Sequence, residues 1–303
     1  MDEFHKPVLL KETLTYLNVR RNKKYIDATV GGGGHAVEIV KRGGILLGLD
    51  VEPDAVGAVK TRLERARLDF DSRSEARRGN FRDIEKIAKE NDFYPVAGIL
   101  YDLGLSNYQL EQSGRGFSFQ KNEPLDMRAD PDLEVTAADL VNGLSESELV
   151  KLFEKYGEEK YARAVAGAII RSRWDGPIRT STELADIVEQ VVREPRKTHP
   201  ATKVFQALRI AVNDELNNLQ SSLPQAFGLL EPKGRLVVIS FHSLEDRIAK
   251  NFFKEMEAKG GKILTKKPIT PTEEEVERNP RARSAKLRAV EKWLNCQIVK
   301  LLI

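Results

Sequence analysis

The sequence has very little cysteine and no long apolar run. Its one cysteine, Cys296, cannot form a disulfide within the chain or a CxxC pair for zinc, which excludes a disulfide-stapled secreted scaffold and a zinc ribbon. No segment approaches the ~18 consecutive apolar residues of a membrane-spanning helix, and the N-terminal residues lack the apolar core of a signal peptide. We therefore expect a cytoplasmic protein that is neither secreted nor inserted in a membrane.

Charge of either sign is not in large excess. The 49 Lys and Arg residues face 46 Asp and Glu residues, and the net charge of +3 is too small to indicate nucleic-acid binding by bulk charge. The four histidines have no second ligand at helical or hairpin spacing, so no metal site is expected. What is present is 303 residues, 41% of them hydrophobic, which suffices for one large or two ordinary globular domains.

The first organised segment reads as strand, glycine turn, helix and strand. The glycines at 31–34 break a β-prone run at 25–30, a helix is predicted over 35–42, and an apolar strand over 45–49 ends at Asp50. A right-handed parallel βαβ unit is the usual outcome of this pattern. It would bring the glycine turn and Asp50 together at the carboxyl edge of a sheet, where open α/β sheets bind ligands.

Later strands extend the same pattern. Strands are predicted at 96–101, ending in Asp102, and at 236–240, ending in the polar run 241–243. The segments 262–265 and 285–290 predict two late strands that could pair antiparallel. A late hairpin after a fifth parallel strand resembles the seven-stranded sheet of class I methyltransferases.

A helical region interrupts the strands. Capping boxes at 145–148 and 180–183 each predict a helix start, Pro195 is expected to close the second helix, and a third helix is predicted near 202–219. A region of about a hundred residues with consecutive helices favours an inserted all-α domain over a second α/β domain.

The predicted fold class is therefore α/β: a class I methyltransferase (Rossmann-like) sheet of parallel strands, a C-terminal antiparallel hairpin and an inserted all-α domain. Residues 1–112 and 214–303 would form a discontinuous cofactor-binding domain. Residues 113–213 would form the insert, which we expect to recognise the substrate.

The glycine turn indicates a nucleotide cofactor. Residues 31–36 fit the pattern G-x-G-x-x-A, and Asp50 follows Gly31 by 19 positions, at the strand end where an acid can hold both ribose hydroxyls. NAD, FAD and S-adenosylmethionine sites share this layout, and a merely tight strand–helix turn is the alternative without function. A P-loop is disfavoured because no Gly-Lys-Ser/Thr follows the glycines.

The acid at the end of another predicted strand helps to choose among these cofactors. The run Asp102 to Ser106, DLGLS, stands where amino-group methyltransferases keep Asp/Asn-Pro-Pro-aromatic, although the prolines are absent. A carboxylate there would offset a sulfonium charge and accept a hydrogen bond from a methionyl ammonium group. The alternative is that Asp102 is a helix N-cap.

Six blocks form an ordered pattern over essentially the whole chain. They are Gly33-Gly34-His35, DLGLS at 102–106, GRGFSFQKNEPLDMR at 114–128, FQALRIAVNDEL at 205–216, ISFHSLEDR at 239–247 and RSAKLRAVE at 283–291. Together they resemble the bacterial 16S ribosomal RNA cytosine-N4 methyltransferase family, which acts at the decoding centre of the small subunit. The resemblance implies S-adenosylmethionine as cofactor and 16S rRNA, within the small ribosomal subunit, as partner. The sequence leaves the oligomeric state open, a homodimer included.

The resemblance also implies where the cofactor binds. The backbone at Gly33, Gly34 and His35 would hold its methionyl end, and Asp50 would take the ribose. For His35, this is a role of the backbone N–H and not of the ring.

Three more residues would complete the site. Phe81 would lie by the adenine, and Asp102 and Gln109 would finish the pocket. From spacing alone, Phe81 could equally be a core residue and Gln109 an ordinary helix-surface residue. The family more often has Ser after the DLGxS run, where this chain has Asn107.

Methyl transfer from a sulfonium is an in-line displacement that depends on alignment. The exocyclic N4 of cytosine is a poor nucleophile, so an acceptor for N4–H would help it attack. We hypothesise that Asp102 is this catalytic residue and accepts both from N4–H and from the methionyl ammonium group. The carbonyl of Leu103 and the edge at 240–243 are alternative acceptors for N4–H. A paired cytosine hides N4, so the target must be unpaired or flipped.

Several residues could contact RNA. Phe117, Phe119 and Phe241 are candidates for stacking on bases, with a core role as the alternative. The stretch 278–292 carries six basic residues against one acid, as a phosphate contact or a solvated face. The loop 114–128 could close over the cofactor.

Two other functions use one piece of the pattern each. An NAD-dependent oxidoreductase would use the glycine turn, and a non-enzymatic RNA-binding or ribosome-assembly module would use the basic stretch. The first should bind NADH, and the second should bind RNA whether or not a cofactor is present.

Overall fold

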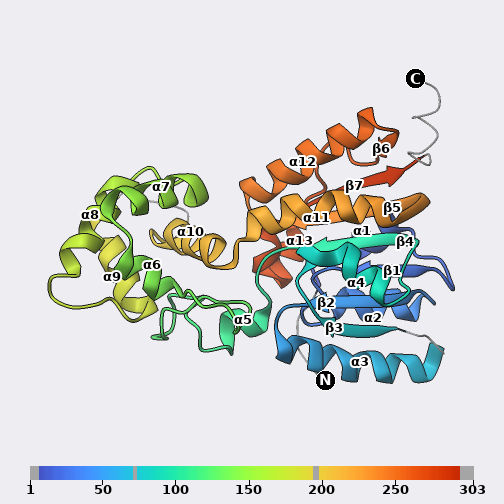
Figure 1. The fold of residues 1–303 in the computed structure, drawn as a ribbon, viewed down its shortest axis with the longest axis horizontal. Helices are drawn as coiled ribbons and strands as arrows, with labels where there is room; N and C mark the ends of the chain where they lie inside the picture. Colours follow the sequence, from blue (N-terminus) through green and yellow to red (C-terminus); the bar gives the residue numbers. More distant parts are fainter. Residues whose placement is uncertain (1–6, 71–73, 194–197, 294–303) are drawn as a thin grey trace. The chain divides into compact units, whose positions relative to one another are not determined.

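The computed structural model describes residues 7–70, 74–193 and 198–293. Contacts between Cα atoms divide the chain into two compact units (Figure 1). One, which we call the sheet unit, is formed by Met1–Ser106 with Leu216–Ile303, and the other, the helical unit, by Asn107–Glu215. Each unit is described by itself.

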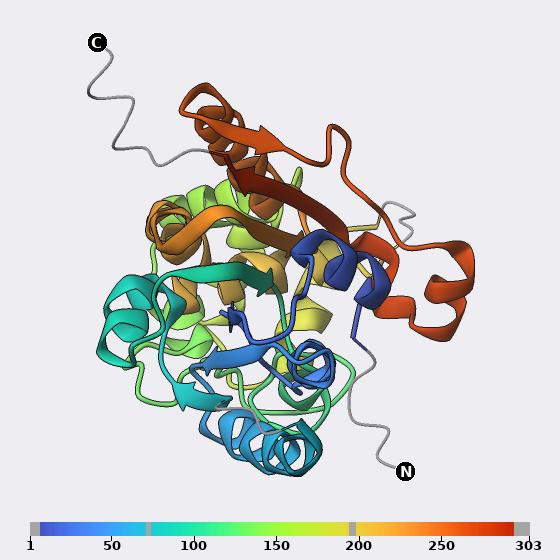
Figure 2. The same cartoon turned by 90° about the vertical axis from the view of Figure 1, so that its right-hand side faces the viewer.

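The sheet unit is built on one seven-stranded sheet in the order β3-β2-β1-β4-β5-β7-β6 (Figures 1 and 2). The first five strands pair in parallel, and β7 runs antiparallel to both of its neighbours, β5 and β6. The predicted class I methyltransferase sheet and its late antiparallel pair are thereby confirmed. The strands are β1 (Lys24–Asp27), β2 (Ile45–Asp50), β3 (Glu75–Arg78), β4 (Val96–Asp102), β5 (Leu230–Ser240), β6 (Gly261–Ile263) and β7 (Lys286–Lys292).

Strand β3 is absent from the sequence-based prediction. Its four residues, EARR, are mostly polar, and only Ala76 is buried, so no apolar run marks it. It is a strand because its backbone pairs with residues 47–50 of β2. Pairing with a neighbour, rather than its own side chains, determines this element.

Helices cover both faces of the sheet, because successive strand residues point to opposite sides. In β1, Tyr25 packs in a cluster with residues of α1, α2 and α3, whereas Ile26 packs with residues of α4, α11 and α12. Both side chains are fully buried. The helices of this unit are α1 (Leu10–Leu17), α2 (Gly34–Lys41), α3 (Pro53–Phe70), α4 (Ile84–Glu90), α11 (Glu215–Leu229), α12 (Ser243–Ala258) and α13 (Glu273–Arg278), with 3-10 turns η1 (Phe81–Asp83) and η2 (Pro280–Ser284).

The helical unit is formed by consecutive helices, as predicted. Both predicted capping boxes are present: Ser145 with Glu148 begins α7, and Thr180 with Glu183 begins α9. The helices are α5 (Asn107–Glu111), α6 (Ala137–Gly143), α7 (Glu146–Gly157), α8 (Ala162–Ser172), α9 (Ser181–Val191) and α10 (Thr202–Asn213).

The single helix predicted near 202–219 is wrong. It is two helices, α10 and α11, separated by Asp214 in the left-handed conformation at φ 50°. The apolar stripe runs through the break without interruption, so periodicity alone could not reveal it. Helix α9 ends at Val191, and Pro195, expected to close it, lies outside the described residues.

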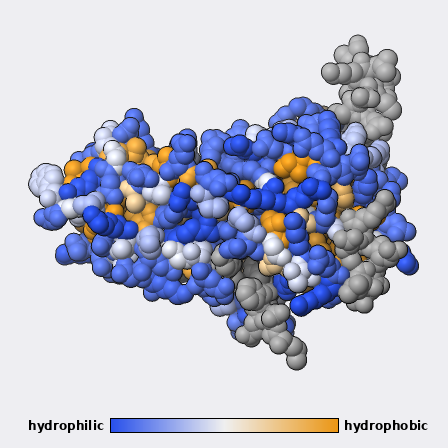
Figure 3. Space-filling model, turned by 60° about the horizontal axis from the view of Figure 1, so that its bottom comes forward, coloured by the Kyte–Doolittle hydropathy of each residue, from blue (hydrophilic) through white to orange (hydrophobic). Residues whose placement is uncertain are grey.

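The surface in Figure 3 is mostly hydrophilic, with apolar side chains in small separate patches. Within the described residues, no helix combines the length and apolar character needed to cross a membrane.

Two neighbouring glycines allow a matched test of close packing in the helical unit. Gly114 and Gly116 both have positive φ, +65° and +67°, where alanine costs about 1 kcal/mol. An added Cβ at Gly116 would lie 2.3 Å from the carbonyl oxygen of Pro124, whereas at Gly114 nothing lies within 4 Å. We predict that Gly116→Ala lowers the free energy of unfolding by about 2 kcal/mol more than Gly114→Ala, as measured by urea titration. Equal losses would contradict the close approach.

Candidate active site

The strands of the parallel sheet end in polar residues at one edge. Asp27 ends β1, Asp50 ends β2 and Asp102 ends β4, next to the end of β5 at Ser240. Strand pairing aligns these ends, since Asp27 is in register with Leu100 and Asp102 with Ile239. The sheet unit therefore brings three carboxyl groups to the edge at which α/β folds bind ligands.

The glycine turn between β1 and α2 lies at this edge. Gly33 has a φ of +76° and its amide donates to the carbonyl of Val30, which closes the turn immediately before α2. A Cβ on Gly33 would lie 3.0 Å from Val59 of α3, so a larger residue there would be strained and crowded. The turn presents backbone N–H groups at the start of a helix, where they suit the anionic end of a ligand.

Asp50 holds the glycine turn in place. Its Oδ2 accepts a hydrogen bond from the amide of Gly31 at 2.9 Å, and its Oδ1 accepts one from the amide of Glu52 at 3.0 Å. Burial raises the pKa of Asp50 to about 6, although hydrogen bonds from backbone amides oppose that shift. Each oxygen keeps a second lone pair, so the carboxylate can still accept from a ligand hydroxyl group.

Asp102 pairs with His35, which the sequence did not reveal. Nδ1 of His35 lies 3.3 Å from Oδ2 of Asp102, and Nε2 lies 3.0 Å from the carbonyl oxygen of Val8. The other carboxylate oxygen of Asp102, Oδ1, is buried and has no hydrogen-bond partner among the described residues. The alternative role as a helix N-cap is wrong, because the next helix, α5, begins only at Asn107.

The ring of His35 is buried, with 4% of its surface exposed. Burial lowers its pKa, but the hydrogen bond to Asp102 and the charges of Asp102 and Asp27 outweigh that effect and raise the pKa above its usual value. Sequence reasoning gave His35 a backbone role only; the structure adds a side chain engaged on both nitrogens.

Asp27 is a second residue that sequence reasoning missed. It is 1% exposed, its Oδ1 accepts from the amide of Thr29 at 3.2 Å, and burial raises its pKa to about 7. The charge of His35 lowers that pKa, and the charges of Asp102 and Asp50 raise it. The available signal in the sequence was an acid within a β-prone run, four positions before the first glycine.

The remaining predicted site residues lie in different units. Phe81 begins η1, three positions after the β3 residue that pairs with Asp50, and is half-buried with its ring edge-on to Tyr101 at 5.5 Å. Gln109 belongs to the helical unit, where α5 carries it and its side chain is buried. The sheet unit thus gathers Gly33, Gly34, His35, Asp50, Phe81 and Asp102 along the ends of β1, β2, β3 and β4.

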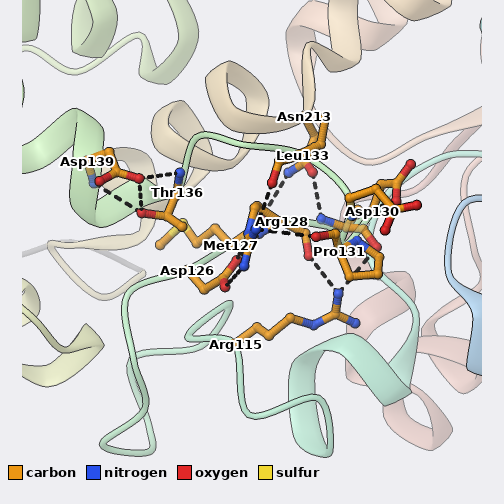
Figure 4. Close-up of polar contacts among 12 residues, drawn as sticks. Arg115, Asp126, Met127, Arg128, Asp130, Pro131, Leu133, Thr136, Asp139 and Asn213 are labelled. Carbon is orange, nitrogen blue, oxygen red and sulfur yellow. Dashed lines mark hydrogen bonds and ion pairs between the residues drawn. The ribbon is translucent and has the colours of Figure 1, made fainter.

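The loop 114–128 is tied to its own unit (Figure 4). Arg128 makes a two-pronged ion pair with Asp126, at 2.8 and 2.7 Å, and also donates to the carbonyl of Leu133 at 2.6 Å. Arg115 donates to the carbonyl of Arg128 at 2.8 Å, and Asn213 donates to the carbonyl of Met127 at the same distance. These bonds indicate that the loop 114–128 is a fixed part of the helical unit rather than a flap that moves independently.

The aromatic candidates for base stacking differ in exposure. Phe117 is 6% exposed and so belongs to the core, against the stacking hypothesis. Phe119 is half-buried and stacked on His199, with ring centroids 4.3 Å apart. Phe241 is half-buried at the end of β5 and lies beside Gly104. Of the three, Phe241 stands at the carboxyl edge of the sheet.

Much of the basic stretch at 278–292 is engaged within the protein. Arg288 is 8% exposed and forms a two-pronged ion pair with Asp246 at 2.6 and 3.2 Å. Lys292 donates to two backbone carbonyls, and Arg278 pairs with Glu274. These contacts reduce the stretch's capacity to bind phosphates.

The fold and site define the class of protein. A sheet in the order 3-2-1-4-5-7-6 with antiparallel β7, and a glycine turn facing strand-end acids, is the architecture of class I methyltransferases.

Sequence comparison gives the family. The model of the MraW methylase family matches residues 2–293, and the chain belongs to this family. A protein named ribosomal RNA small subunit methyltransferase H from Carboxydothermus hydrogenoformans is 45% identical over 311 residues, covering 96% of this chain and 99% of its own. One of the same name from Thermomicrobium roseum is 47% identical over 308 residues, with 95% and 93% covered.

The pKa of Asp27 leads to a pH-dependent prediction. In the unfolded chain Asp27 has the usual pKa of 3.8 and ionises at lower pH than in the folded protein. The stability that its native carboxyl contributes is therefore full below pH ~4 and is lost as the pH rises to about 7. An asparagine in its place cannot ionise and keeps the acceptor for Thr29. Asp27→Asn should therefore raise the Tm by a few degrees at pH 8 and by much less at pH 4.5 in calorimetry. A Tm change of the same size and sign at both pH values would show that ionisation is not the cause.

Proposed function

We propose that this protein is an enzyme that transfers the methyl group of S-adenosylmethionine to the exocyclic N4 of a specific cytidine in 16S rRNA of the small ribosomal subunit. The observation that carries the proposal is the acid-lined carboxyl edge beside the glycine turn, in a chain of the MraW methylase family. The relatives' name, ribosomal RNA small subunit methyltransferase H, supports RNA as the acceptor. The N4 atom rests on the resemblance of the sequence blocks.

The residues present fit a cationic cofactor. The buried Oδ1 of Asp102 lacks a donor among the described residues, which is costly for a carboxylate oxygen unless a ligand supplies one. In our proposal the backbone at Gly33, Gly34 and His35 holds the methionyl end of the cofactor, and the Asp50 carboxylate accepts from its ribose. Phe81 would contact the adenine, and the resemblance assigns Gln109 to the cofactor as well.

The bound cofactor would supply an activated methyl group on a positively charged sulfur. The protein's task is alignment of the N4 lone pair with the methyl–sulfur bond. In our proposal Asp102, at the end of β4, accepts hydrogen bonds both from the methionyl ammonium group and from N4–H, and its unpartnered Oδ1 supports this role. A carboxylate acceptor would favour the pyramidal geometry that N4 adopts as it attacks. It would also stabilise the positive charge that develops on N4.

The two units differ in their balance of charge. The helical unit has 15 Lys and Arg residues against 19 Asp and Glu, whereas the rest of the chain has 34 against 27. We therefore assign phosphate contacts mainly to basic residues of the sheet unit other than the engaged Arg278, Arg288 and Lys292. We retain the insert as the part that recognises the substrate. In this proposal it recognises the shape of the acceptor RNA rather than the charge of its phosphates.

The cellular setting follows from the substrate. A protein that methylates ribosomal RNA works where small subunits are assembled, and we infer a cytoplasmic location.

The function is tested by incubation with labelled S-adenosylmethionine and small ribosomal subunits that lack the modification, followed by nuclease digestion and mass analysis of the nucleosides. We expect N4-methylcytidine at a single position. Labelled RNA with a different methylated nucleoside would overturn the choice of N4. Absence of label, together with NADH binding or with RNA binding indifferent to cofactor, would favour one of the two other functions.

The same assay tests the role of Asp102. Asp102→Asn keeps the shape but removes the charge, so we expect turnover to fall at least about 100-fold. Asp186→Asn, at an exposed position on α9, is the matched control and should leave turnover unchanged. Full turnover by Asp102→Asn with normal cofactor binding would remove Asp102 from the mechanism.

A further inference from the structure

The geometry points to a positioning role for the His35 side chain. We infer that His35 is a doubly protonated imidazolium whose Nδ1–H holds Oδ2 of Asp102, so that Oδ1 alone faces the ligand. The protonation state follows from this chain's own contacts. The ligand-facing role of Oδ1 rests on the proposed function.

The contact on Nε2 determines the first proton. The carbonyl oxygen of Val8, 3.0 Å away, can only accept a hydrogen bond, so Nε2 must carry a hydrogen. A neutral ring of that tautomer would have a bare lone pair on Nδ1. The pair would then face a carboxylate oxygen 3.3 Å away, which is repulsive.

A second proton between Nδ1 and Oδ2 relieves this repulsion. The surrounding charges place it on the ring: Asp102 on β4 and Asp27 on β1 face His35, and Asp50 on β2 faces Asp27. All three are acids, and the segment before α1 contributes the Val8 carbonyl. An imidazolium among carboxyl groups is favoured over a neutral ring, because an opposite charge nearby stabilises the charged form.

The contact with His35 determines which carboxylate oxygen of Asp102 is left for a ligand. A carboxylate at a strand end could turn either oxygen toward a ligand, but Oδ2 is engaged by His35 and the amide of Asp102 is fixed by Thr29 Oγ1 at 2.6 Å. Oδ1 is left buried without a partner among the described residues. His35 also connects this acceptor to the segment that precedes α1, through Val8.

The protonation state is tested on the protein alone by long-range ¹H–¹⁵N correlation spectra of its histidines. There are only four histidines, His5, His35, His199 and His242, and the His35→Gln spectrum identifies the signal of His35. We expect both ring nitrogens of His35 to carry hydrogens at pH 7.5, where an ordinary histidine has lost one. A neutral ring with hydrogen only on Nε2 at pH 6 would overturn the inference, whatever the enzyme's activity.

Two substitutions separate positioning from mere packing. Asparagine at position 35 puts an amide N–H near the place of Nδ1, toward Asp102, whereas glutamine puts one near the place of Nε2, toward Val8. We expect His35→Gln to lower kcat/KM for methyl transfer about tenfold or more relative to His35→Asn. We expect kcat/KM of the wild-type protein to decline at high pH as His35 loses its proton, and we expect both variants to lack this decline. The opposite ranking, or an unchanged pH profile in both variants, would overturn the positioning role.

These outcomes are distinct from failure of the proposed function. If the wild-type protein methylates no RNA, the spectra still decide the protonation of His35. If it methylates RNA and the spectra give a neutral ring, the function stands and the inference falls.

Discussion

The crowding of carboxyl groups at one edge of a parallel sheet is the constraint on which the site depends. Asp27, Asp50 and Asp102 end three neighbouring strands, and burial raises the pKa of the first two to about 7 and about 6. His35 is a titratable base that interacts with Asp102 and Asp27. Such an edge favours a further positive charge, and the sulfonium of S-adenosylmethionine would provide one. The glycine turn is part of the same arrangement, because Asp50 binds its first amide.

Much of the fold could be predicted from the sequence. The parallel strands end in polar residues, and the capping boxes at Ser145 and Thr180 begin helices as expected. These signals are local, since side chains a few residues apart carry them. Strand β3 and the break at Asp214 could not be predicted, because a neighbouring strand determines the first and a single backbone torsion determines the second.

The sequence predicted where the site lies but not which side chains contact one another in it. Motif and resemblance led to Asp50 and Asp102, yet neither could indicate that the ring of His35 would reach Asp102, since the two are 67 positions apart. Asp27 was overlooked because it lies within an otherwise β-prone run. The blocks around 114–128 and 239–247 illustrate a further limit: Arg128 stabilises its own loop, and Glu245 accepts from the amide of Phe241 at 2.8 Å at the start of α12. A particular sequence block can thus reflect structure near a site rather than chemistry in it.

The most direct test of the account is whether a cation binds at the acidic edge. At pH 6.5, Asp27 and Asp50 are partly protonated, and a bound cation should expel those protons. Calorimetric titration with S-adenosylmethionine, repeated in buffers of different ionisation enthalpy, measures that release. We predict net proton release at pH 6.5 that fades by pH 8, and a smaller release for S-adenosylhomocysteine, which lacks the sulfonium charge. Binding of both ligands with no change in protonation would contradict the account.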